Sequence, residues 1–266
     1  MASPLVLTIA GSDSSAGAGI QADIKTCASL GVYCASVITN VTAQNTCGVQ
    51  SIHPIPTDMV QAQLSAIFTD LNISAVKIGM LGTKSTIETV VQILKEFKPK
   101  HIIVDPVMVS SSGKPLIKAD AVNALITQLF PIATLITPNI PEAATLLDIP
   151  QAQSKEEMYK TIAELKVFGS QSILLKGGHL IGDKCIDLLL DNNKVHELSQ
   201  AKVETKNTHG TGCTLSSAIS ANLALGDSIK EAVFKANEYL NNAIKQADDL
   251  NIGKGSGPVH HFHKQW

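Results

Sequence analysis

The residues best suited to chemistry in this chain lie together in the stretch 207–214. Gly210 and Gly212 flank Thr211 where a polar segment meets a run of small, helix-compatible residues. The start of a helix carries unpaired N–H groups and partial positive charge, so this junction is a natural site for an anion such as phosphate. Cys213 follows in the first helical turn, where the pKa of a thiol tends to fall. The same pattern also fits a simple glycine turn before a buried helix.

Four further polar side chains follow apolar runs of strand-like composition. Asp105 precedes a proline, where its carboxylate can approach a Mg²⁺–phosphate cluster or simply stabilise a turn. Asn139 and Glu142 offer oxygen atoms that suit Mg²⁺, directly or through water, although Glu142 also fits the acidic first turn of a helix. Lys176 precedes two glycines and can reach phosphate oxygens or remain a solvated strand end. Taken singly, none of the four specifies a function.

Two familiar phosphate-binding motifs are absent from the sequence. No G-x-x-x-x-G-K-[ST] segment occurs, which excludes a P-loop protein. Gly11, Gly17 and Gly19 resemble part of a dinucleotide fingerprint, but Ala22 stands where the spacing requires the last glycine. A nicotinamide-dependent dehydrogenase is therefore a weak alternative.

Short apolar strands that alternate with amphipathic helices must position these residues. The predicted strands are residues 5–10, 33–41, 75–78, 101–104, 134–136 and 172–176, with a hairpin around residues 191–194. A helix is expected over residues 119–130, and Ser228 is expected to cap the last helix. This alternation is typical of βαβ units and predicts an α/β fold with a mostly parallel sheet and helices on both faces. Ligands then bind beyond the carboxyl ends of the strands, where the polar residues fall.

Composition limits the classes of function that remain. The 266 residues contain no linker or repeat, so we expect a single domain over residues 1–266. With a net charge of −2 and no basic block, nothing suggests a nucleic-acid surface, and no apolar run suggests a membrane span or a signal peptide. The five cysteines are odd in number and lack a CxxC pair. We therefore expect reduced thiols in a cytoplasmic protein, with neither a disulfide framework nor a zinc site.

The order of motifs along the chain resembles one enzyme family. The matching segments are residues 8–13, 17–23, 43–46, 77–81, 105–108, 137–143, 176–179, 207–213 and 257–261. Together they resemble the hydroxymethylpyrimidine and phosphomethylpyrimidine kinases of thiamine biosynthesis, in the ribokinase-like superfamily. The resemblance spans essentially the whole chain, so it is far more specific than any single motif.

The resemblance implies a three-layer αβα ribokinase-like fold and a cytoplasmic homodimer that binds neither nucleic acid nor membrane. It implies ATP and Mg²⁺ as cofactors, with a monovalent cation as an optional addition. The implied substrate is a small pyrimidine, whose hydroxymethyl group and then monophosphate are phosphorylated to the diphosphate used in thiamine assembly.

The resemblance also implies roles for residues of the phosphate site. Gly210, Thr211 and Gly212 would form an anion hole for the transferred phosphoryl group. The ATP and Mg²⁺ site would comprise Asp105, Asn139, Glu142, Lys176 and Thr208, with Asp105 and Glu142 facing the metal, directly or through water. Cys213 occupies the position where the wider superfamily commonly has aspartate, which leaves the identity of the general base open.

The remaining implied roles concern the pyrimidine. Gln44, in a polar turn after a strand, would read the ring edge by paired hydrogen bonds, helped by Asp23 and the backbone of Gly11. Met80 and Val107 would flank the ring.

Two alternatives remain beside this reading. Pyridoxal kinase activity, sole or secondary, would use the same fold and phosphate machinery on another ring, although an amide at Gln44 favours an aminopyrimidine. A non-catalytic carrier of a vitamin precursor would leave the phosphate-site residues without a task. For the His-rich C-terminal tail, solvated surface is the default expectation.

Overall fold

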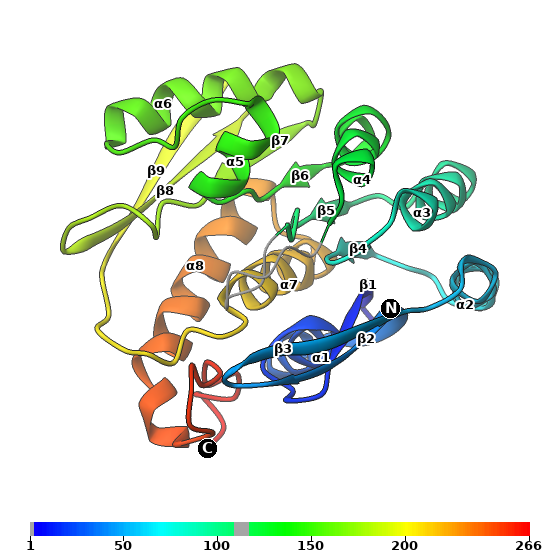
Figure 1. The fold of residues 1–266 in the computed structure, drawn as a ribbon, viewed down its shortest axis with the longest axis horizontal. Coiled ribbons are helices and arrows are strands. Elements are labelled where there is room, and N and C mark those ends of the chain that lie inside the picture. The colour runs from blue at the N-terminus through cyan, green and yellow to red at the C-terminus, as the bar shows by residue number, and fades with distance from the viewer. Residues whose placement is uncertain (1–2, 109–116) are drawn as a thin grey trace.

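The computed structural model describes residues 3–108 and 117–266, which form three layers, with one sheet between two layers of helices (Figure 1). The nine strands lie in the order β3-β2-β1-β4-β5-β6-β7-β8-β9. They are β1 (Leu5–Asp13), β2 (Tyr33–Asn45), β3 (Gly48–Pro54), β4 (Ala75–Ile78), β5 (Ile102–Val104), β6 (Leu135–Ile136), β7 (Ser172–Leu175), β8 (Lys184–Asp191) and β9 (Lys194–Ala201). The six from β2 to β7 pair in parallel, whereas β3, β8 and β9 pair antiparallel with their neighbours. The predicted α/β architecture with a mostly parallel sheet is confirmed.

The helices cover both faces of the sheet (Figure 1). One face carries α2 (Thr57–Asp70), α3 (Lys84–Phe97), α4 (Ala119–Ala124), α5 (Ile140–Leu147) and α6 (Lys155–Glu164), and the other carries α1 (Gly19–Ser29), α7 (Thr211–Ala224) and α8 (Ile229–Lys245). Consecutive strand residues divide between the two cores: Leu7 packs with the first set of helices, and Val6 with the second. Side chains of a strand alternate between faces, so continuous apolar runs fill both cores.

Small side chains allow α7 to lie deep in the second core. Ser216, Ser217, Ala218 and Ala221 are fully buried. Ser216 satisfies its hydroxyl within the helix, because Oγ donates to the Gly212 carbonyl at 2.9 Å. A helix with such small side chains can pack close to the sheet, and this places its first turn at the strand ends.

Some element boundaries differ from those that the sequence predicts. β1 continues through Gly11 to Asp13, and Gln44 lies on β2 rather than in a turn, because β3 pairs with it as a hairpin. The helix expected over residues 119–130 shortens to α4 and ends in a π-helical turn and a 3₁₀ turn that contains Pro131, which cannot continue the hydrogen-bond ladder. By contrast, the Ser228 cap and the hairpin turn at Asn192 and Asn193 are confirmed.

Candidate active site

A cavity of about 750 Å³ runs along the carboxyl ends of the parallel strands. All but one of the residues that the sequence predicts for the site line it: Gly11, Gln44, Met80, Asp105, Val107, Asn139, Glu142, Lys176, Thr208, Gly210, Thr211, Gly212 and Cys213. The exception is Asp23. Because each parallel strand delivers its final residues to the same edge, side chains far apart in the chain meet there.

The glycines at the start of α7 allow a tight approach of backbone to backbone. Gly210 has a φ of 80°, and a Cβ on it would lie 1.9 Å from the carbonyl oxygen of Gly17. A Cβ on Gly212 would lie 3.1 Å from Asp105 Oδ2 and 3.5 Å from Lys176 Nζ. The first turn of α7 therefore faces both the Asp105 carboxylate and the Lys176 ammonium group, at a position where a larger side chain would be crowded. This geometry favours an anion site over a simple turn.

The facing cation belongs to an ion pair in which Asp105 is buried and Lys176 is half-buried. Lys176 Nζ lies 2.8 Å from Asp105 Oδ1, which also accepts a hydrogen bond from Thr137 Oγ1 at 3.0 Å. Asp105 is only 3% exposed. Burial opposes the charge of Lys176, but Asp105 and then Glu142 outweigh it and raise its pKa. Neither residue is the exposed strand end that the sequence suggests.

Glu142 has a local structural role at the start of α5. It forms a capping box with Asn139: the Asn139 side chain accepts from the Glu142 N–H at 2.8 Å, and Glu142 Oε2 accepts from the Asn139 N–H at 2.9 Å. Burial raises the pKa of Glu142 to about 7; Lys176 opposes this effect and Asp105 adds to it. The interpretation as a helix-start residue is therefore correct, and it does not prevent Glu142 from lining the cavity.

Asp105 and Glu142 could provide only part of the coordination shell of a metal ion. Within the described residues, no three His, Cys, Asp or Glu side chains are grouped so that they could hold a metal ion. Asp105 and Glu142 do supply oxygen donors to the cavity. Mg²⁺ takes such donors sparingly, because it keeps several waters and binds phosphate oxygens. The donor set therefore fits a Mg²⁺ ion held between protein, water and nucleotide.

The pKa of the Cys213 thiol is raised, whereas its place in the first helical turn predicts that it falls. Burial raises its pKa to about 11; Lys77 opposes this shift and Asp23 and Asp105 reinforce it. Burial and the two nearby carboxylates disfavour a thiolate at this position, which is opposite to the effect expected of a helix start. The raised pKa favours a neutral thiol at physiological pH.

Asp23 does not line the cavity beside the pyrimidine, as the resemblance implies, because its carboxylate points into the core. It forms an ion pair with Lys77, whose Nζ lies 2.9 Å from both carboxylate oxygens, and it accepts from Thr8 Oγ1 and Ser217 Oγ. Both members of the pair are fully buried. Burial opposes the charge of Lys77, yet Asp23 raises its pKa. A lysine in the otherwise apolar run of β4 is the sequence signal for this pair.

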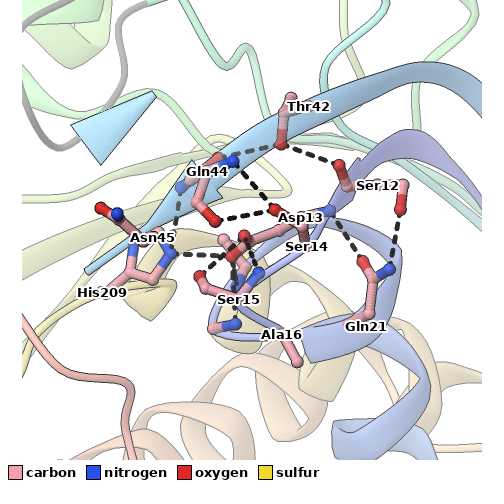
Figure 2. A network of polar contacts seen from close by, with 12 residues as sticks. Ser12, Asp13, Ser14, Ser15, Ala16, Gln21, Thr42, Gln44, Asn45 and His209 are labelled. Atoms are coloured by element: carbon pink, nitrogen blue, oxygen red, sulfur yellow. Dashed lines mark hydrogen bonds and ion pairs between the residues drawn. The ribbon is translucent and has the colours of Figure 1, made fainter. Parts of the chain in front are cut away.

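A polar network links Gln44 to the start of α7 (Figure 2). His209 Nε2 lies 2.8 Å from Asp13 Oδ2 and 3.1 Å from Gln44 Nε2. Burial disfavours the Asp13 carboxylate, but hydrogen bonds from His209, Ser15 and Ala18 lower its pKa to about 2. An ionised Asp13 only accepts, so His209 Nε2 carries the proton, and the Gln44 atom beside it is best assigned as the amide oxygen.

The sequence did not indicate the far end of the cavity. It is lined by Lys202 and Val203 after β9 and by Asn237, Leu240 and Asn241 on α8. These residues carry no motif, since a helix face and a strand end of ordinary composition meet only in the folded chain. The cavity thus extends from β2 past the anion site to β9.

Known proteins match this chain along nearly its whole length. A profile of the family described as "Phosphomethylpyrimidine kinase" matches residues 13–260. The "Hydroxymethylpyrimidine/phosphomethylpyrimidine kinase" of Rhizobium meliloti (strain 1021) is 49% identical over 262 residues, which cover 98% of each chain.

Solved structures share the fold at high similarity. The pyridoxal kinase of Bacillus subtilis, determined as an ADP complex, matches with a TM-score of 0.92 and 36% identity over 99% of each chain. The phosphomethylpyrimidine kinase of Clostridium difficile 630 matches with a TM-score of 0.80 and 44% identity over 91% of this chain and 99% of that chain. The sequence matches and these structures agree, and the chain belongs to the phosphomethylpyrimidine kinase family of ribokinase-like enzymes.

Proposed function

We propose that this protein transfers the γ-phosphoryl group of ATP to 4-amino-5-hydroxymethyl-2-methylpyrimidine, and then phosphorylates the monophosphate to the diphosphate used in thiamine biosynthesis. One observation carries the proposal: a single cavity joins the amide of Gln44 to the glycine loop that faces the Lys176–Asp105 pair. The names of the sequence relatives support the same reaction.

The order of strands suggests how the substrates share the cavity. Gln44 on β2 and Gly11 on β1 lie at one end, with Met80 and Val107 nearby as apolar walls. We place the pyrimidine there, because an amide presents one donor and one acceptor to an aminopyrimidine edge. We place the nucleoside of ATP at the β9 end, and the phosphates then lie between the two, at the start of α7. The ADP complex of the Bacillus subtilis pyridoxal kinase supports the use of ATP.

The residues between the two ends suit phosphoryl transfer. This reaction needs positioning and charge neutralisation more than covalent chemistry. The first turn of α7 offers N–H groups, and Lys176 offers a fixed cation. Asp105 and Glu142, with Asn139 beside them, would hold Mg²⁺, which neutralises phosphate charge when bound. Cys213, as a neutral thiol, would shape the acceptor pocket rather than remove a proton.

A second acceptor is supported by the structural matches. The Bacillus subtilis protein is named a pyridoxal kinase and superposes on nearly all of this chain. We therefore infer that pyridoxal can serve as a secondary acceptor. We further propose that residues 1–266 act as one kinase domain, in a cytoplasmic homodimer. Among the described residues, no helix is long and apolar enough to cross a membrane.

Product identification tests the proposed function. The purified protein, Mg²⁺ and ATP would be incubated with the hydroxymethylpyrimidine, and products followed by ³¹P NMR. We expect a phosphomonoester resonance that converts into the two coupled resonances of a diphosphate ester. If neither pyrimidine product forms while pyridoxal is phosphorylated, the protein is a pyridoxal kinase instead.

A further inference from the structure

The C-terminal segment is not the solvated tail that its composition suggests. Val259 is fully buried, and His260 and His261 are 5% and 3% exposed. In Figure 1 this segment, at the red end of the chain, lies against the tip of the β2–β3 hairpin. Residues 257–261 belong to a motif of the family resemblance that the proposed reaction leaves without a role.

Three consecutive residues of this segment join two stretches of chain that contribute neighbouring residues to the cavity lining. On the hairpin side, the N–H of Gly255 donates to Thr46 Oγ1 at 3.1 Å, and the N–H of Ser256 donates to the Thr46 carbonyl at 2.9 Å. On the other side, the N–H of Gly257 donates to Asn207 Oδ1 at 2.9 Å, and the N–H of His209 donates to the Gly257 carbonyl at 3.0 Å. Thr46 follows Gln44 by two residues, and His209 precedes the glycine loop.

Glycine is required because the segment passes between these two stretches in close contact. A Cβ on Gly255 would lie 2.1 Å from the Thr46 carbonyl oxygen, and a Cβ on Gly257 would lie 2.4 Å from Asn207 Oδ1. Real Cβ atoms do not approach so closely. A side chain at Gly255 must move the hairpin backbone, and one at Gly257 must displace the Asn207 amide and crowd the Ile252 carbonyl oxygen, which would lie 3.0 Å from the added Cβ.

The end of the segment is anchored to the first turn of α7. His261 Nε2 lies 3.1 Å from Thr214 Oγ1, and Tyr239 on α8 donates its hydroxyl to the His261 carbonyl. The N–H of His260 donates to the Ala243 carbonyl at 2.9 Å. The segment is therefore fixed to α7 and α8, both of which line the cavity.

We propose that residues 255–261 act as a strap that sets the spacing between the ring-reading Gln44 and the phosphate loop at Gly210–Gly212, and so sets the preference between the two acceptors. The monophosphate places its accepting oxygen one phosphate group farther from the ring than the hydroxymethyl oxygen lies. The two acceptors thus require different distances from ring to loop. The inference rests on the proposed function, since it assigns the ring to Gln44 and the phosphoryl group to the loop.

Gly257→Ala is the direct test, with kcat/KM measured for the pyrimidine and for its monophosphate. The added methyl group should move the loop, and we expect the ratio of the two kcat/KM values to change at least about fivefold. A purely structural defect reduces the active fraction and leaves this ratio unchanged. Combining Gly257→Ala with Asn207→Ala removes the contact with the Asn207 amide and leaves the one with the Ile252 carbonyl oxygen, so the ratio should return part of the way toward that of Asn207→Ala alone.

Thr46→Val is the second test variant, and it can be measured even if Gly257→Ala does not fold. It removes only the hydroxyl that accepts from Gly255, and we expect a smaller shift of the ratio in the same direction. Thr69→Val on α2 is the matched control, because its hydroxyl bonds only to its own helix at Ser65 and Ala66. A ratio that stays within twofold in both strap variants, while the parent phosphorylates both acceptors, overturns the strap. A parent that phosphorylates neither acceptor instead overturns the proposed function.

Discussion

Cys213 is the residue whose chemistry the folded chain changes most. Burial raises its pKa to about 11, which favours the protonated thiol at physiological pH and argues against a role as general base. We expect Cys213→Ser to lose less than about tenfold in kcat, whereas removal of a true base costs about 10²–10⁴-fold. Cys213→Asp should be less active than serine, because it adds a carboxylate beside Asp23 and Asp105. Activity of both variants between pH 6 and 9 checks this, and an aspartate variant more active than serine would restore the base role.

The Lys176–Asp105 pair should affect both stability and turnover. Lys176→Ala leaves the Asp105 carboxylate buried without its partner, which costs about 3–5 kcal/mol in comparable pairs. Turnover should also fall about 10²–10³-fold, because a cation at the phosphate site is lost.

The double variant Asp105→Asn with Lys176→Met separates the two effects. It removes both charges, so its unfolding free energy in urea should recover part of the loss while turnover stays low. A Lys176→Ala protein with the parent's stability would show that the pair is solvated after all.

At the scale of elements, the Asp13 carboxylate organises the turn after β1. It accepts from the N–H groups of Ser15, Gly17 and Ala18 and from His209. The shift of its pKa from 3.8 to about 2 corresponds to about 2–3 kcal/mol, present above pH 3.8 and lost as the pH falls through 2. Asp13→Asn should lower the free energy of unfolding by about this amount at pH 7. Urea denaturation checks it, and a difference below 0.5 kcal/mol would mean that the turn forms without the charge.

The elements were predictable where local patterns determine them. Apolar runs located β1, β4 and β7, and Ser228 located the start of α8, because periodicity and capping act over a few residues. β3 was missed since its residues 48–54 are largely exposed and gain a partner only from β2.

Residue roles in the site were predictable only where a motif delivers a side chain to a strand end, as at Lys176. The pKa of Cys213 and the inward orientation of Asp23 depend on neighbours from other elements, which no local pattern specifies.

At the scale of the whole molecule, the buried C-terminal segment should make stability sensitive to acid. Burial lowers the pKa of His261 from 6.5 to about 3, and Lys25, His260, His209 and His263 add positive charge around it. A lowered folded pKa gives stability that is present above pH 6.5 and is lost as the pH falls toward 3. Between pH 6.5 and 5 the parent should lose about 2 kcal/mol more than His261→Gln, at about 1.4 kcal/mol per pH unit. Urea unfolding at pH 7 and pH 5 measures this, and equal losses in both proteins would contradict a buried neutral His261.

The central claim is that one cavity reads a pyrimidine at Gln44 and phosphorylates it at the start of α7. The most direct measurement is ADP release by the parent and by Gln44→Leu, with the hydroxymethylpyrimidine, its monophosphate and pyridoxal as acceptors. We predict that the parent prefers the two pyrimidines. Gln44→Leu should raise their KM at least about tenfold, through the loss of paired hydrogen bonds, while the KM for ATP stays nearly unchanged. An unchanged KM for the pyrimidines, or a parent that prefers pyridoxal, would contradict the account.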